Sequence, residues 1–288
     1  MLKAYFNLTK SGIVIFTLLT GMAGFAGSYT PSESYDWVKL ALFLIGLYLI
    51  SSGSFALNQA QEWRLDSKME RTKERPIPAG VFSTTQAYLI ALLFIVMGSF
   101  LLALINPTTA LLGLITIILY NGFYTLYWKK KWAFGAVPGA IPGAMPVVIG
   151  YSVNTPFLLT PDCGYLFLIM FLWQMPHFWC LAIRYKDDYG GVSIPVLPAV
   201  IGVPKTLYHM GLYTFVYVAL ALSSPWFVTA HAMYFVLVIP FALKVIWEFL
   251  KYYQSDDQKR WLPFFLWTNF SMLAFIIAPV VDKWLYRL

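Results

Sequence analysis

Long apolar runs alternate with short polar connections along almost the whole chain. A helix needs about 20 apolar residues to cross the hydrocarbon core of a bilayer, and nine runs reach roughly that length. They lie at about 12–29, 37–57, 86–105, 108–128, 134–153, 164–183, 207–224, 228–250 and 262–281. The pattern predicts an all-α integral membrane protein with nine transmembrane helices. We expect residues 1–288 to form a single domain.

The composition agrees with this pattern. Of the 288 residues, 59% are hydrophobic and 11% are charged, whereas a soluble domain carries about 25% charged residues. The net charge of +7 would indicate a nucleic-acid partner only if it formed a surface stripe. It is spread over short loops instead, so we expect no nucleic acid. Cys163 and Cys180 stand at opposite ends of one apolar run, too far apart on a helix for a disulfide.

The charges also predict the orientation in the membrane. Basic connections alternate with neutral or acidic ones along the chain, with Lys39, Lys283 and Arg287 as minor exceptions. The positive-inside rule places basic connections in the cytoplasm. It therefore puts the N-terminus in the cytoplasm and the C-terminus outside, as an odd number of spans requires. The polar segments with candidate chemistry all fall on the cytoplasmic side.

The first such segment follows the second apolar run. Its polar residues are Asn58, Glu62 and Asp66 at four-residue spacing, then Arg71, Lys73 and Arg75. On a helix, the first three project from nearly one face. Carboxylate and carboxamide oxygens suit Mg²⁺, which often bridges to substrate phosphates, and the basic residues suit the remaining phosphate oxygens. The segment predicts a Mg²⁺–diphosphate site. The alternative is an ordinary basic juxtamembrane loop.

A second segment follows the fourth run. Tyr124 lies just over one helical turn before Lys129, which begins a run of three lysines that includes Lys130. Lysines can neutralise a diphosphate as point charges. The alternative is a topology signal beside an interfacial aromatic belt.

A third segment spans residues 171–191. Gln174 and His177 are polar groups inside an apolar run, and ionisable residues within a membrane are functional candidates by default. His177 could equally be a hydrogen-bonded core residue. The segment also contains Trp173, Lys186, Asp187 and Asp188. The Gly- and Pro-rich stretch before it, 135–146, predicts close helix packing or a broken helix that lines a cavity, and the two are compatible.

These residues carry a family resemblance. Asn58, Glu62 and Asp66, followed by Met69, Arg71, Thr72, Arg75 and Pro76, resemble the first acidic motif of the UbiA superfamily of intramembrane prenyltransferases. W-Q-M-P-H-F at 173–178, Asp188 with Tyr189, and I-P-V-L-P at 194–198 are similar to the branch that makes haem O. The motifs cover about residues 8 to 200. The family usually has Asp where Glu62 stands and often Arg where Lys130 stands.

The resemblance implies a UbiA-type bundle that transfers farnesyl from farnesyl diphosphate to a vinyl group of haem B, with Mg²⁺ as cofactor. It implies Asn58, Glu62, Asp66 and Asp188 as metal ligands, with Asp187 assisting. It implies Arg71, Lys73, Arg75, Lys129, Lys130 and Lys186 for diphosphate, and Tyr124, Trp173, Gln174 and His177 for haem or the allylic cation. It further implies a bacterial inner-membrane location with a cytoplasm-facing site, and haem A synthase or terminal-oxidase assembly proteins as partners.

Two alternatives remain open from the sequence. One is a UbiA-type enzyme with another acceptor, such as a quinone precursor or a chlorophyllide. The other is a transporter, although its polar residues would be expected near the membrane midplane. The enzyme hypothesis makes one geometric prediction: Asp66 and Asp188 must converge on a shared pocket.

Overall fold

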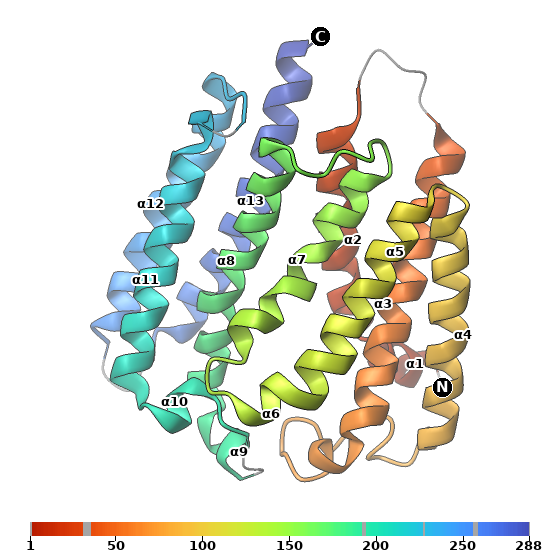
Figure 1. The fold of residues 1–288 in the computed structure, drawn as a ribbon. Helices are drawn as coiled ribbons and strands as arrows, with labels where there is room; N and C mark the ends of the chain where they lie inside the picture. Colours follow the sequence, from red (N-terminus) through yellow and green to blue (C-terminus); the bar gives the residue numbers. More distant parts are fainter. Residues whose placement is uncertain (1, 31–35, 192–193, 227, 256–258, 288) are drawn as a thin grey trace.

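The computed structural model describes residues 2–30, 36–191, 194–226, 228–255 and 259–287, and Figure 1 shows a bundle of long helices. No β-strand occurs in these residues. The elements are α1 (Leu2–Leu8), α2 (Ser11–Ser28), α3 (Trp37–Asp66), α4 (Thr84–Ala103), α5 (Pro107–Ile117), the π-helix η1 (Ile118–Trp128), α6 (Lys129–Lys131), α7 (Ala136–Ser152), α8 (Pro161–Arg184), α9 (Lys186–Gly190), α10 (Leu197–Val200), α11 (Val203–Leu222), the 3-10 turn η2 (Ser224–Trp226), α12 (Ala232–Tyr253) and α13 (Trp261–Arg287).

The all-helical, multi-pass character predicted from the sequence is confirmed. Each of the nine apolar runs coincides with one long helix, or with α5 continued into η1. Within the described residues, seven helical segments are both long and apolar enough to cross a membrane. α7 has only 17 residues, and α11 is not among the seven. The number of nine spans therefore stays a prediction.

Glycines let α2 and α7 approach very closely. A Cβ atom on Gly24 would lie 1.9 Å from the carbonyl oxygen of Val147, and one on Gly150 would lie 1.9 Å from that of Gly21. Small residues of this kind allow membrane helices to pack backbone against backbone. Close packing in the 135–146 stretch is thereby confirmed, and residues of α7 also line a cavity, but the predicted break is wrong, because the helix continues through Pro142 and Pro146.

Two apolar cores lie on either side of α7. The larger is built mainly from α7, α8, α11, α12 and α13, and the smaller from α2, α3, α4, α5 and α7. Cys163 and Cys180 are buried, free thiols on α8, as expected for cysteines too far apart to bridge.

The polar segments gather at one end of the bundle. Figure 1 shows α6, α9, α10 and the connection from α3 to α4 at this end, with the C-terminus at the other. Met69, just after α3, packs in one apolar cluster with Ala182, Tyr189 and Val196. This cluster holds the first and third polar segments together.

Candidate active site

The final turns of α3 carry the first candidate group. Asn58, Glu62 and Asp66 are at most 5% exposed, and all three line a cavity of about 600 Å³. Their spacing thus places them on one face, as the sequence predicted. After α3 the chain turns back, because the Thr72 hydroxyl donates a hydrogen bond of 2.9 Å to the carbonyl of Asp66.

Each carboxylate on this face holds a basic side chain from another part of the chain. Lys129 Nζ donates to both carboxylate oxygens of Glu62 at 2.8 Å. Arg75 donates to Oδ2 of Asp66 at 2.6 Å. Charge-assisted hydrogen bonds of this length are among the stronger polar contacts in proteins. The acidic face and the basic residues therefore form one site.

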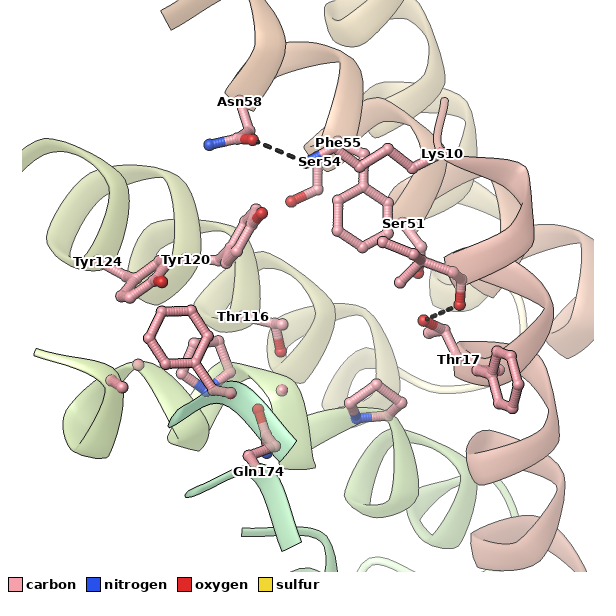
Figure 2. Close-up of a pocket in the computed structure, with 18 of the residues that line it drawn as sticks. Lys10, Thr17, Ser51, Ser54, Phe55, Asn58, Thr116, Tyr120, Tyr124 and Gln174 are labelled. Atoms are coloured by element: carbon pink, nitrogen blue, oxygen red, sulfur yellow. Dashed lines mark hydrogen bonds between the residues drawn. The ribbon is translucent and has the colours of Figure 1, made fainter. Parts of the chain in front are cut away.

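Lys10 completes this arrangement, although it was not identified as a site residue from the sequence. Its Nζ donates to Oδ1 of Asn58 at 3.0 Å and lies 5.3 Å from the centre of the Phe55 ring. Figure 2 shows this contact at the cavity. Burial lowers the pKa of Lys10 to about 7, and the positive charge of Arg75 contributes. The backbone of Lys10 is left-handed (φ 49°), a conformation that costs a non-glycine residue about 1–3 kcal/mol and is found at functional sites.

The π-helix η1 forms a further wall. Tyr120, Tyr124 and Lys129 all line the cavity, and Figure 2 shows both tyrosines beside it. In a regular α-helix, Lys129 would be rotated about 140° from Tyr124, whereas the wider turn of π-type i→i+5 bonding reduces this rotation. Thr125 donates to the Tyr120 carbonyl at 2.8 Å and accepts from Asn58 at 3.1 Å, which attaches η1 to α3.

The third segment meets the first at Arg71. This residue lines the cavity, and its backbone N–H lies 3.4 Å from Oδ2 of Asp188. Its guanidinium lies 5.5 Å from the centre of the Tyr185 ring. Tyr189, next to Asp188, also lines the cavity. Asp66 and Asp188 therefore lie at the same end of the protein, beside one cavity, although Asp188 itself is not part of its wall.

Four further predicted residues are not on the cavity wall. Lys73, Lys130, Lys186 and Asp187 are exposed, and Lys73 instead pairs with Glu70 at 2.5 Å. Their roles stay predictions from the resemblance.

Gln174 lies on the wall formed by α8. Its Nε2 donates to the carbonyls of Ala140 at 2.9 Å and Met170 at 3.0 Å. A Cβ on Gly143 would lie 2.0 Å from the Gln174 side-chain oxygen, so only glycine leaves room for it. Figure 2 shows Gln174 across the cavity from Asn58.

His177 is held next to Gln174 by aromatic rings and an amide. The ring centres of Trp173 and Phe265 lie 4.6 and 4.8 Å from that of the histidine. Its Nδ1 lies 2.9 Å from Oδ1 of Asn269 on α13. Asn269 was missed in the sequence, although a polar residue inside an apolar run was the available signal.

The donor set fits Mg²⁺ by its chemistry. Among the described residues, no three His, Cys, Asp or Glu side chains form a ready-made metal cluster. Mg²⁺ does not require one, because it usually binds through one or two carboxylates, several waters and substrate phosphates. Of the described residues that line the cavity, four are basic (Lys10, Arg71, Arg75 and Lys129) and two are acidic (Glu62 and Asp66). This excess of positive charge suits a polyanionic ligand.

Comparison with known proteins places this site in a family. The model of the UbiA prenyltransferase family matches residues 14–270. The chain belongs to the UbiA prenyltransferase family. It is 51% identical over 284 residues to a protoheme IX farnesyltransferase of Bdellovibrio bacteriovorus, covering 99% of this chain and 97% of that one. It is 34% identical over 286 residues to a protoheme IX farnesyltransferase of Leptospira biflexa, covering 98% and 99%. The resemblance stated from the motifs is thereby confirmed.

Solved structures show that the UbiA fold is shared. A digeranylgeranylglyceryl phosphate synthase superimposes with a TM-score of 0.77 at 17% identity, covering 97% of this chain and 99% of that one. A UbiA homolog from Archaeoglobus fulgidus bound to DMAPP and Mg²⁺ gives 0.63 at 17% identity, covering 96% and 99%. The protein is thus a multi-pass UbiA-family prenyltransferase.

Proposed function

We propose that this prenyltransferase transfers the farnesyl group of farnesyl diphosphate to a vinyl group of haem B, with addition of water, to give haem O and diphosphate. The observation that carries the proposal is one continuous cavity. A charged end built from α3, η1 and Lys10 adjoins an aromatic wall with Gln174 and His177. Two relatives that align along nearly their whole length are named protoheme IX farnesyltransferases, which supports this donor and acceptor.

The charged end binds the diphosphate in this proposal. Asn58, Glu62, Asp66 and Asp188 would hold Mg²⁺, with Asp187 assisting. The metal supplies charge neutralisation to the leaving diphosphate. The basic residues take the remaining phosphate oxygens: Lys10, Arg71, Arg75 and Lys129 from the cavity wall, and Lys73, Lys130 and Lys186 from its surroundings. Because diphosphate is a poor leaving group until its charge is compensated, preorganised cations lower the barrier to ionisation.

The carbon–oxygen bond breaks with its electron pair going to diphosphate, which leaves an allylic cation. The rings of Tyr124 and Trp173 line the same cavity and stabilise that cation by cation–π attraction. The vinyl π-electrons form the new carbon–carbon bond. Water then captures the resulting carbocation and loses a proton. The farnesyl chain lies against apolar helices, where burial is worth about 0.8 kcal/mol per CH₂.

The membrane placement belongs to the same proposal. We propose nine spans in a single domain over residues 1–288, with the N-terminus in the cytoplasm and the C-terminus outside. The site would face the cytoplasm across a bacterial inner membrane, with haem A synthase or terminal-oxidase assembly proteins as partners. Two observations support the orientation: the basic segments gather at the site end of the bundle, and the C-terminus lies at the other end (Figure 1).

Incubation of the purified protein with haem B, farnesyl diphosphate and Mg²⁺, followed by mass spectrometry, tests the proposal. We expect haem O and an equal amount of released diphosphate, both lost when Mg²⁺ is chelated. A parallel reaction with 4-hydroxybenzoate tests the closest alternative. Prenylation of that acceptor, with haem B unchanged, would contradict the proposal.

A further inference from the structure

Asn269 determines which nitrogen of His177 carries a proton. Its side-chain amide is oriented, because Nδ2 donates to the carbonyl of Phe265 at 2.9 Å. Oδ1 therefore faces Nδ1 of His177, 2.9 Å away. An amide oxygen can only accept a hydrogen bond, so Nδ1 must donate. In the neutral ring, this leaves Nε2 unprotonated with a free lone pair.

The free nitrogen belongs to a side chain on the cavity wall. His177 lines the cavity, and Trp173 and Phe265 hold its ring in place. In the part of the chain that the structure describes, no group hydrogen-bonds to Nε2. A metal-ligating histidine typically donates its other ring N–H to a carbonyl or carboxylate, which fixes its tautomer and orientation.

We propose that Asn269 is a positioning residue that presents Nε2 of His177 as an axial ligand to the iron of the haem acceptor. The inference rests on the proposed function, because it specifies how that acceptor is held. Imidazole is a common axial ligand of haem iron. The contact joins α8 to α13, so the ligand is anchored on two helices rather than on a mobile loop.

The position of His177 along α8 suits this role. The other α8 residues on the cavity wall around it, Trp173, Phe178 and Leu181, carry no charge. A haem held there would lie against these side chains rather than against the charged residues of α3 and η1. Ligation through the iron thus separates the two substrates within one cavity and leaves the edge of the porphyrin free to meet the prenyl chain.

Haem binding tests the proposal independently of turnover. Haem B is titrated into the detergent-purified full-length protein without farnesyl diphosphate. Absorbance reports ligation, and resonance Raman of the ferrous form reports the iron–histidine stretch. We expect a histidine-ligated spectrum that His177→Ala abolishes. Asn269→Leu should weaken haem binding about 10- to 100-fold and lower the stretching frequency, because the donated hydrogen bond is lost.

Two further variants separate positioning from folding. Asn269→Asp keeps an acceptor and adds negative charge, so it should retain binding and raise the stretching frequency. Ser271→Ala removes a buried hydrogen bond between α13 and Tyr217 (3.1 Å) without touching His177, and should leave the spectrum unchanged. If Asn269→Leu and Asn269→Asp both bind haem with the wild-type affinity and frequency, Asn269 is only structural and the proposal is overturned.

Failure of this inference is distinguishable from failure of the proposed function. A wild-type protein that farnesylates haem B without a histidine-ligated spectrum would overturn the inference and leave the function standing. A protein that prenylates another acceptor and neither binds nor modifies haem would overturn both.

Discussion

Glu62→Gln is the most informative single change at the site. It keeps the shape of the side chain but removes the charge that faces Lys129 at 2.8 Å. At that distance, two unit charges attract by about 6 kcal/mol with an effective dielectric constant of 20, before desolvation is subtracted. Removing one member of a buried pair typically costs about 3–5 kcal/mol, because the other charge stays behind. Lys129 is 21% exposed, so water compensates in part, and we expect a loss of about 2–4 kcal/mol in stability.

The same substitution should reduce turnover by about 100-fold or more, since 2.7 kcal/mol of lost transition-state stabilisation corresponds to that factor. Product formation is measured by chromatography of the haem. Thermal unfolding is followed with a thiol-reactive dye, because Cys163 and Cys180 are buried in the folded protein and react once it opens.

A double variant separates the two effects. Glu62→Gln combined with Lys129→Met removes both charges of the pair, so stability should return toward the wild-type value while activity stays lost. Turnover within about threefold of wild type in the single variant would refute a role for Glu62 in the chemistry. An unchanged melting temperature in the single variant would refute the ion-pair argument.

Three further predictions concern other parts of the protein. Because the pKa of Lys10 is lowered to about 7, the side chain loses its positive charge as the pH rises from about 6 to 8. The diphosphate affinity of the wild type, divided by that of Lys10→Met and measured by calorimetry, should therefore fall across this range. A ratio that stays constant with pH would contradict the prediction. Gly150→Ala should push α2 and α7 apart and lower both the melting temperature and the free energy of unfolding, the latter by about 1–3 kcal/mol. Gly164→Ala should leave both unchanged, because a Cβ atom at that position would have no neighbour within 4 Å. In intact cells, an impermeant maleimide should label Leu159→Cys but not Val81→Cys; the reverse pattern would invert the proposed orientation.

The apolar runs and local spacings determined much of this protein. Hydrophobic length predicted the long helices, since a bilayer requires about 20 apolar residues per span. The four-residue spacing of Asn58, Glu62 and Asp66 placed their oxygens on one face of α3, because helical periodicity is a local property. Gln174 and His177 stood out as polar residues in an apolar run. Together with the motifs these signals were sufficient for the family and for every charged residue of the cavity wall except Lys10.

Long-range packing decided which partner each of these residues received. Lys10 reaches Asn58 across 48 positions, and Asn269 reaches His177 across 92. From the sequence alone, a lysine before a span cannot be distinguished from a topology signal. Whether it belongs to a binding site depends on which helix it faces in the folded protein. The π-helical hydrogen bonding that directs Lys129 toward Glu62 likewise could not be predicted, because no periodic pattern in the sequence indicates a π-helix. Local spacing determines the face on which a side chain lies, but only the packed bundle determines what that face meets.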